Sequence, residues 1–217
     1  MLARIRMLRE AARLLRDPDR LGDGAILKSE AAGVRATPEV EAKLVDVRGF
    51  VPAIDLERLR SLPVGTLGRA YGDFMHDNGL HPFRVTDAYR PLAAKNTFAL
   101  RYAVTHDLFH VLLGFDTSWT GEMGVLAFAC AQRYVRMQSV ALVFAAILYP
   151  LWAPRQTFAI WRALRAGLAM GARARFLLGE RLEDRFEEPL AHVRASYAIE
   201  PWRGERDTFP RALGAPS

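Results

Sequence analysis

The sequence predicts an all-α fold organised as a single multi-helical domain. Apolar residues recur at three- and four-residue intervals along most of the chain, and no segment alternates convincingly with period two. Capping residues and glycines separate these segments, as is typical of helix ends. The length of 217 residues with 51% hydrophobic content suffices for one full core and falls short of two ordinary domains.

The N-terminal segment, residues 1–42, is predicted to be an amphipathic helix followed by an irregular, glycine-rich stretch that starts at Asp17-Pro18. The apolar positions of the helix are Leu2, Ile5, Leu8, Ala12 and Leu15, and arginines occupy its other faces. Such a basic helix is either an ordinary packed surface helix or an interfacial anchor to anionic lipid. Its scattered charges and the lack of a small-residue cleavage site disfavour a secretory signal.

Residues 43–200 are predicted to form the helical domain, and residues 201–217 a polar tail. Proline, glycine and Asn78-Gly79 mark the helix boundaries. The expected helices cover residues 38–48, 56–60, 66–77, 94–113 and 157–178, with another starting near Gly121 or Glu122, and residues 180–198 form a final acidic and amphipathic segment.

Residues 137–154, "MQSVALVFAAILYPLWAP", contain no charge and barely reach the length that crosses a bilayer. Pro150 and Pro154 shorten the usable helix. We therefore expect a buried hairpin or a lipid-facing groove here, not a transmembrane span.

The composition narrows the classes of partner. A net charge of +6 suits nucleic acid, an anionic membrane surface or an acidic ligand. No helix-turn-helix, RNP or zinc-finger pattern is present, so we expect no nucleic-acid partner. Cys130 is the only cysteine, which excludes an intramolecular disulfide and favours a reducing, cytoplasmic compartment.

Residues 102–132 place two histidines and an aspartate within one helical turn. At 100° per residue, His106, His110 and Asp107 project within about a quarter turn of one another. The loop "GFDTSWTG" then reverses the chain and returns Glu122 to the same place. Imidazoles with carboxylates suit zinc, iron or manganese, so we predict a metal site between two antiparallel helices. The alternative is a set of core groups satisfied by salt bridges.

Two better-known motifs compete with this interpretation. The zincin pattern HExxH needs a glutamate where Asp107 stands, which makes a peptidase improbable on chemical grounds. An HD-type metal phosphohydrolase is the second alternative, with His76 or His81 and Asp184 as further ligands. That arrangement leaves His110 and Glu122 without a role.

Several further side chains are candidates for binding substrate. Arg133 lies on the same predicted helix face as Glu122 and is either a solvated arginine or an anion anchor. Tyr71, Tyr102, Trp119 and Arg101 either line the site or belong to the core. The small residues Ala127, Ala129, Cys130 and Ala131 let another helix approach closely.

Two segments, "LPVGTLGRAYGDFM" (62–75) and "RYAVTHDLFHVLLGFDTSWTGEMGVLAFACAQ" (101–132), resemble the Coq4 family of ubiquinone-biosynthesis proteins. The signature of that family is HDxxH followed by eleven residues and a glutamate. The chain meets it in full, and the resemblance extends from about residue 43 to 200.

The resemblance implies a helical protein on a membrane surface that modifies a polyprenylated quinone precursor. The implied metal ligands are His106, Asp107, His110 and Glu122, with zinc or iron as the metal and Glu122 as the catalytic residue. The implied chemistry is oxidative decarboxylation at ring carbon C1, where a hydroxyl replaces a carboxyl. The alternative is a non-catalytic prenyl-lipid carrier or scaffold.

The resemblance also implies partners and a location. The expected partners are the polyprenylated quinone precursor, an anionic membrane surface, a second copy of the chain as a homodimer, and other quinone-biosynthesis proteins. No mitochondrial targeting segment is apparent and arginine usage is heavy, which indicates a bacterial homologue. We therefore expect a cytoplasmic protein, peripheral to the cytoplasmic face of the inner membrane.

Overall fold

The computed structural model describes residues 2–204, and every regular element in that range is helical. Within these residues, one isolated antiparallel bridge joins Thr66 to Pro189. The all-α prediction is therefore confirmed for the described part of the chain. From residue 205 onward, the predicted polar tail lies outside the described residues.

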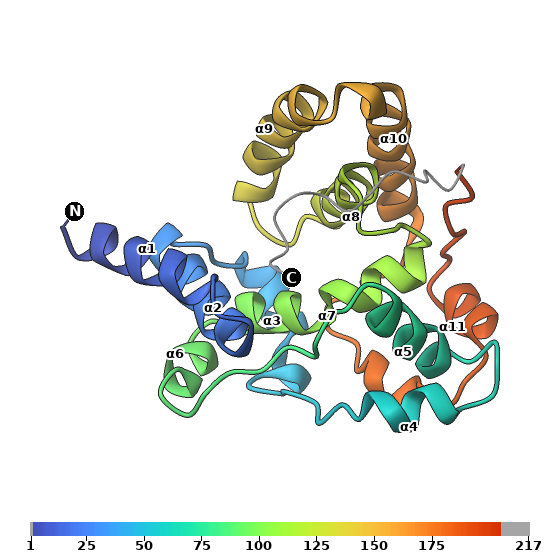
Figure 1. Cartoon of the computed structure of the whole chain (residues 1–217), viewed down its shortest axis with the longest axis horizontal. Coiled ribbons are helices and arrows are strands. Elements are labelled where there is room, and N and C mark those ends of the chain that lie inside the picture. Colours follow the sequence, from blue (N-terminus) through green and yellow to red (C-terminus); the bar gives the residue numbers. More distant parts are fainter. Residues whose placement is uncertain (1, 205–217) are drawn as a thin grey trace.

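Figure 1 shows the order of the helices, which short single-turn segments and loops connect. The helices are α1 (Leu2–Leu14), α2 (Leu21–Ala32), α3 (Pro38–Lys43), α4 (Leu56–Ser61), α5 (Leu67–Asp77), α6 (Arg90–Ala94), α7 (Thr97–Leu113), α8 (Trp119–Ala131), α9 (Met137–Trp152), α10 (Thr157–Arg173) and α11 (Leu190–Ser196).

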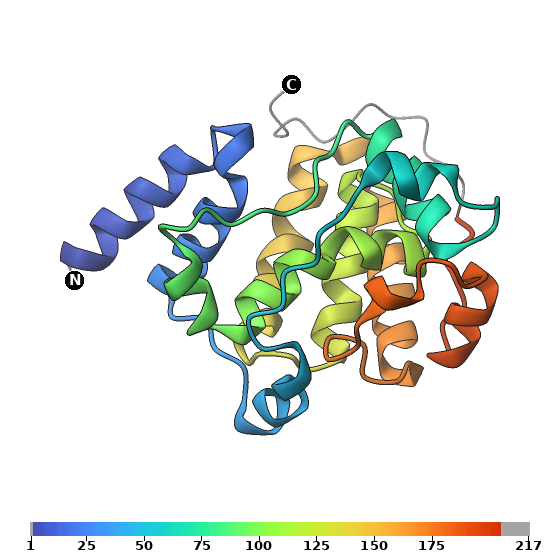
Figure 2. The same ribbon diagram turned by 90° about the horizontal axis from the view of Figure 1, so that it is seen from below.

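Helix α7 forms the centre of the molecule and crosses its middle in both Figure 1 and Figure 2. Most of its residues are buried, and one main apolar core surrounds it. Asn96 begins the helix, since its side chain accepts a hydrogen bond from the Ala99 N–H at 3.1 Å. Gly114 ends it in the left-handed conformation with φ 77°. A helix that is apolar on all sides is expected to be central in this way.

Helix α8 packs most extensively against α10, and small residues at that interface explain why. A Cβ atom on Gly167 would lie 2.2 Å from the carbonyl oxygen of Gly124, and one on Gly171 would lie 2.5 Å from that of Phe128. The prediction that small residues of this segment admit a neighbouring helix is confirmed at Ala127 and Ala131, which face these glycines.

The relation between α7 and α8 differs from the predicted antiparallel pair. In Figures 1 and 2, α8 crosses α7 and does not run alongside it. Helix α8 packs mainly on α10, while Glu122 in its first turn approaches the histidines of α7 and Phe128 near its end contacts Phe109, with ring centroids 6.0 Å apart.

The stretch after Asp17-Pro18, predicted to be irregular, is in fact helical as α2. Its glycines serve close packing instead of breaking the helix. A Cβ on Gly22 would lie 1.7 Å from the carbonyl oxygen of Arg84, and one on Gly24 would lie 2.8 Å from Leu15. Gly33, with φ 68°, ends the helix. Helix α1 packs on α2 through Ala11 and Leu14.

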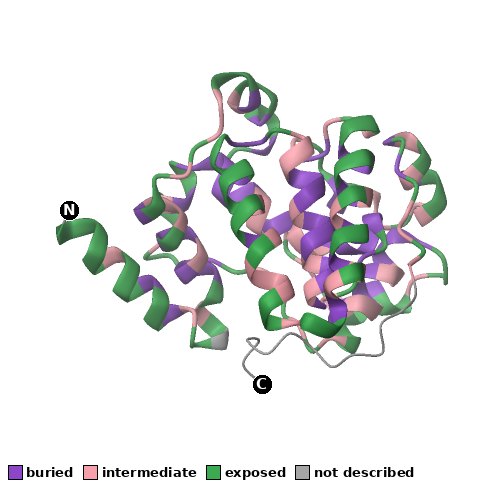
Figure 3. Cartoon of the chain, turned by 90° about the horizontal axis from the view of Figure 1, so that it is seen from above, coloured by how far each residue is buried: buried purple, intermediate pink, exposed green. Residues whose placement is uncertain are grey.

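Helix α9 is apolar but mostly exposed, which contradicts the buried-hairpin interpretation. Only Gln138 and Ala145 of its 16 residues are buried. Figure 3 views the molecule from the side of α9 and α10 and shows exposed residues along both helices. Within residues 2–204, no helix taken alone is long and apolar enough to cross a bilayer, although α9 and α10 meet that criterion as a pair bent by 114°.

Candidate metal centre

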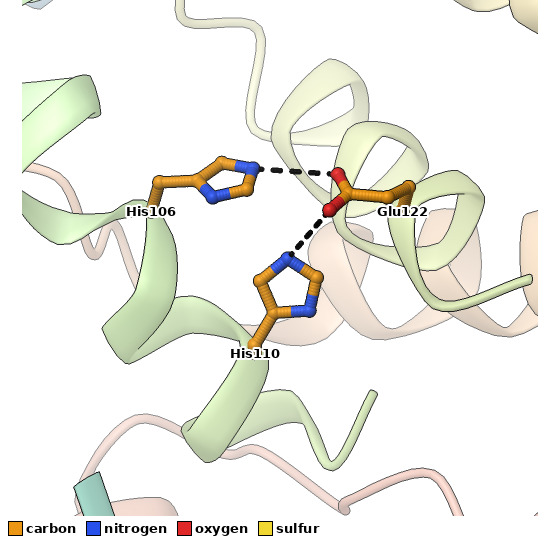
Figure 4. A group of neighbouring side chains, drawn as sticks. All are labelled: His106, His110 and Glu122. Carbon is orange, nitrogen blue, oxygen red and sulfur yellow. Dashed lines mark ion pairs between the residues drawn. The ribbon is translucent and has the colours of Figure 1, made fainter. Parts of the chain in front are cut away.

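Two histidines of α7 and one glutamate of α8 point toward a common centre (Figure 4). Glu122 Oε2 lies 3.6 Å from His106 Nε2, and Oε1 lies 3.4 Å from His110 Nε2. One potential ligand atom from each of the three residues lies within 4.8 Å of the others. The structure thus brings together three of the four side chains that the sequence singled out.

The loop between α7 and α8 holds Glu122 in this position. The Ser118 hydroxyl accepts a hydrogen bond from the Gly121 N–H at 3.2 Å and caps α8, and Asp116 in turn accepts bonds from the N–H and hydroxyl of Ser118. Gly121 is required because a Cβ there would lie 1.9 Å from the carbonyl oxygen of Asp116. Glu122 therefore occupies the first turn of α8, where the helix dipole favours a carboxylate.

His110 shows that these residues fit a cation. Its side chain is 1% exposed, and neither ring nitrogen makes a hydrogen bond within the described structure. Phe74 stacks on its ring with centroids 5.7 Å apart. A buried imidazole without a hydrogen bond is unfavourable, and a divalent ion shared with Glu122 and His106 would satisfy it. Imidazole and carboxylate donors favour zinc or iron over magnesium.

The electrostatics of the group favour positive charge at its centre. Burial disfavours a charged His106, but its contact with Asp107 and the charges of Glu122 and Asp107 raise its pKa to about 8. Burial likewise opposes ionisation of Glu122, yet its close contact with His110 and the charges of both histidines lower its pKa. The positive charge of a protonated His106 would interact with the neighbouring carboxylates as a bound metal ion would.

Asp107 has a different position from the other three residues. Its Oδ1 lies 3.4 Å from Nδ1 of His106, on the far side of the ring from Glu122, and it is absent from the three-residue group. A carboxylate on the second nitrogen of a histidine commonly fixes the ring for metal binding. The structure therefore favours an orienting contact for Asp107, whereas the sequence indicated a ligand.

A pocket of about 580 Å³ opens beside His106 and Asp107. Its wall comes from α2, α7, α8 and the start of α9, and it is largely apolar. Phe83, Phe98, Tyr102, Leu126, Val135 and Met137 line it. An apolar cavity with a few polar groups at one point is typical of a small-molecule site.

Of the three aromatic residues that the sequence singled out, Tyr102 contacts a histidine of the candidate metal centre, and the other two pack against aromatic side chains elsewhere. Tyr102 meets the His106 ring edge-on at 5.9 Å and lines the pocket. Tyr71 is buried against Phe186, and burial together with the charge of Asp107 raises its pKa. Trp119 packs against Tyr149 and Trp152.

The two predicted arginines lie outside the group. Arg101 is fully buried in an ion pair with Glu183 at 2.6 Å and also donates to the carbonyl oxygens of Leu178 and Glu180. These contacts account for Arg101 as a structural residue. Arg133 follows the end of α8 with φ 55°, is exposed, and is absent from the pocket wall.

The residues needed for the HD-type alternative do not gather at the site. His76 contacts Asp77 at 3.2 Å on the exposed end of α5. Within the described residues, neither His76, His81 nor Asp184 belongs to the potential metal group.

Three neighbours of the site were not anticipated from the sequence. Phe74 stacks on His110, Tyr149 has its pKa raised by burial and by the charge of Glu122, and Lys28 lines the pocket. Phe74 belongs to the segment 62–75 that carries the family resemblance, and this location in the sequence could have identified Phe74 as a neighbour of the site. Lys28 and Tyr149 depend on how α2 and α9 pack, which local periodicity does not indicate.

Fold and site together define an all-helical protein with a candidate divalent-metal centre beside an apolar pocket. Residues 50–203 match the family model "Coenzyme Q (ubiquinone) biosynthesis protein Coq4". The chain belongs to this family, whose members take part in ubiquinone biosynthesis.

Individual relatives agree with this assignment. The chain is 32% identical over 158 residues to the mitochondrial ubiquinone biosynthesis protein COQ4 homologue of Nematostella vectensis, with 69% of this chain and 73% of that protein covered. The Danio rerio homologue is 32% identical over 176 residues, with 77% of this chain and 62% of that protein covered. The chain spans only about half of the Rattus norvegicus homologue, at 56%.

A solved structure shares the fold. A protein of Nostoc punctiforme, provisionally assigned to ubiquinone biosynthesis, superimposes with a TM-score of 0.60 at 25% identity, over 90% of this chain and 94% of that one.

Proposed function

We propose that this protein removes the ring carboxyl group of a polyprenylated benzoate-type quinone precursor at C1 and replaces it with hydroxyl. The observation that carries the proposal is the position of His106, beside the apolar pocket on one side and facing Glu122 on the other. A lipid tail in the pocket would present its ring to the candidate metal centre. The exchange releases carbon dioxide and is a two-electron oxidation, for which dioxygen is the simplest oxidant.

Each residue of the centre has a proposed role. His106, His110 and Glu122 would hold zinc or iron, while Asp107 would hold the His106 ring in place through Nδ1. When bound, the ion would supply Lewis-acid polarisation of the carboxylate, and iron would add redox chemistry. Glu122 would accept or return a proton at this point, and the role is supported by the two histidines, which lower its pKa despite its burial and so favour the ionised carboxylate.

The pocket supports binding of an isoprene tail. Its wall is mainly aromatic and aliphatic. At about 0.8 kcal/mol per buried carbon, one five-carbon isoprene unit contributes roughly 3 to 4 kcal/mol of binding free energy. The tail would therefore supply most of the affinity, and the ring groups would supply orientation.

We also propose peripheral binding to an anionic membrane surface, at the cytoplasmic face of the inner membrane. Helices α9 and α10 expose large apolar side chains, among them Phe144, Trp152 and Phe158, the last 88% exposed. Arg136, Arg155 and several arginines of α10 flank them. Apolar contact combined with arginine contact to lipid phosphate is the pattern of an interfacial helix. A second copy of the chain and other quinone-biosynthesis proteins are further proposed partners.

A non-catalytic prenyl-lipid carrier or scaffold is the second candidate. It is favoured by the wall of the pocket, since Met137 and Gln138 at the start of the exposed helix α9 contribute to it. Because the exposed apolar face of α9 continues into the pocket wall, a prenyl lipid could pass between a membrane and the pocket without any participation of a metal.

The experiment that separates the two uses protein purified without oxygen. Its metal content and co-purified lipid are measured, and it is then given a prenylated 4-hydroxybenzoate-type precursor, with and without chelator, before exposure to air. An enzyme releases carbon dioxide and forms the hydroxylated ring only with metal present. A carrier binds the precursor equally in both conditions and releases none.

A further inference from the structure

We propose that Lys28 of α2 binds the anionic group on the ring of the pocket's ligand, and so selects carboxylated prenyl lipids over neutral ones. This inference rests on the proposed function for the identity of the ligand. Lys28 would act as a positioning residue, since it holds the ring at the end of the pocket near His106.

Lys28 lies on the pocket wall together with His106 and Asp107. Its ammonium group interacts electrostatically with His106. Within residues 2–204 it forms no ion pair or hydrogen bond. A cation at a cavity wall with its donors unused is available to a ligand.

The charge of the pocket explains why an anionic ligand needs this lysine. The pocket wall carries the Asp107 carboxylate, which would repel a carboxylated ring. Among the described residues that line the pocket, Lys28 is the only lysine or arginine. It therefore offsets Asp107 and gives the ring carboxylate an attractive partner on the wall that it shares with His106.

The packing of α2 holds Lys28 over α7. Near the start of the helix, buried Asp23 accepts hydrogen bonds from the Thr86 N–H at 2.9 Å and the Thr86 hydroxyl at 2.8 Å. Just after its end, the Asn96 side chain donates to the Val34 carbonyl oxygen at 2.9 Å. Because both ends of α2 are tied, the backbone at Lys28 keeps its place beside the pocket.

The position of Lys28 in the chain makes this contact distinct from the metal group. It lies outside residues 50–203, the part that matches the family model. Helix α2, which packs on α1 at the N-terminus, would thus take part in ligand selection, and this role is separate from metal binding by α7 and α8.

The test measures binding of three lipids with the same isoprenoid tail to metal-free, full-length protein in detergent. The lipids carry 4-hydroxybenzoate, its neutral benzamide, or a monophosphate. Lys28→Met is compared with Lys28→Arg and with Lys95→Met, which removes the same charge from an exposed site at the end of α6, outside the pocket. Lys28 is exposed, so these variants are expected to fold, and circular dichroism checks this.

We expect Lys28→Met to bind the benzoate lipid about three- to tenfold more weakly, because a partly exposed ion pair contributes modestly. Binding of the benzamide should be unchanged, Lys28→Arg should restore benzoate binding, and Lys95→Met should resemble the wild type. Equal losses for benzoate and benzamide, or a loss confined to the monophosphate, would overturn the inference. Failure of the wild type to bind any of the three would instead overturn the proposed function.

Discussion

Nε2 of His110 lies 3.4 Å from Oε1 of Glu122 on the next helix, yet neither ring nitrogen of this buried histidine makes a hydrogen bond. Folding has removed the imidazole from water and left both ring nitrogens without a hydrogen bond. With His106 completing the group, the arrangement is one in which a cation provides the missing interaction.

Removal of His110 should abolish metal binding without unfolding the protein. His110→Ala is expected to retain less than a tenth of the wild-type metal content, because the two remaining donors form a much weaker site. Elemental analysis measures the content and circular dichroism the helicity. His76→Ala, on an exposed histidine of α5, is the matched control and should keep full metal content. Full occupancy in His110→Ala would show that the ligands lie elsewhere.

Metal affinity should depend on pH through His106. Because its pKa is raised to about 8, this imidazole must lose a proton before it can bind a metal at neutral pH. The apparent affinity for zinc should therefore rise by about tenfold per pH unit up to roughly pH 8 and level off above it. Asp107→Asn removes a contact that raises the pKa, so its plateau should begin at lower pH. An unchanged profile in that variant would contradict the orienting role of Asp107.

Membrane binding should depend on the exposed face of α9 and α10. Phe158→Asp places a carboxylate on that face and should reduce co-sedimentation with anionic vesicles several-fold, since it removes apolar contact and adds repulsion. Val64→Asp changes an equally exposed apolar residue between α4 and α5 and should have no effect. Raised salt should weaken wild-type binding. Retention after high-salt and alkaline washes would indicate insertion into the bilayer instead.

The contact between α8 and α10 should tolerate no added side chain at Gly167. A Cβ there would lie 2.2 Å from the carbonyl oxygen of Gly124, so Gly167→Val should destabilise the fold by about 1 to 3 kcal/mol or more. Ala169→Val, on the exposed side of α10, is the control and should change the free energy of unfolding little. Denaturant unfolding measures both. Equal stability of the two variants would argue against this helix contact.

Local patterns predicted the helices that carry the candidate site. Thr66, Asn78-Gly79 and Gly114 mark ends that the structure reproduces within a few residues, because caps and left-handed glycines act through neighbouring backbone groups. The spacing of His106 and His110 with a short capped loop before Glu122 was enough to predict that the three would converge.

Features set by packing between distant segments were not predictable in this way. The close approach of α8 to α10 depends on glycines of α10 that lie far from α8 in the sequence. Helix α2 was missed because Gly22 and Gly24 resemble helix breakers, and only the structure shows that Arg84 and Leu15 pack against them. Lys28 and Tyr149 approach the site only through those tertiary contacts. The long charge-free segment left a buried hairpin and a lipid-facing groove as alternatives, because apolarity alone does not separate a buried helix from an exposed one. The structure contradicts the buried hairpin, since α9 is mostly exposed.

The central claim, that His106, His110 and Glu122 hold a metal that acts on the ring of a prenylated precursor, is tested most directly by Glu122→Gln. Glutamine keeps the size of the side chain but not its charge, so the pocket and the affinity for the lipid tail should persist. Mature quinone is measured in cells that depend on the wild-type protein, on Glu122→Gln or on His106→Ala, all supplied with a prenylated 4-hydroxybenzoate-type precursor. The account predicts that both variants bind the lipid and form little or no quinone. Normal quinone levels in both variants would contradict it and leave the carrier as the function.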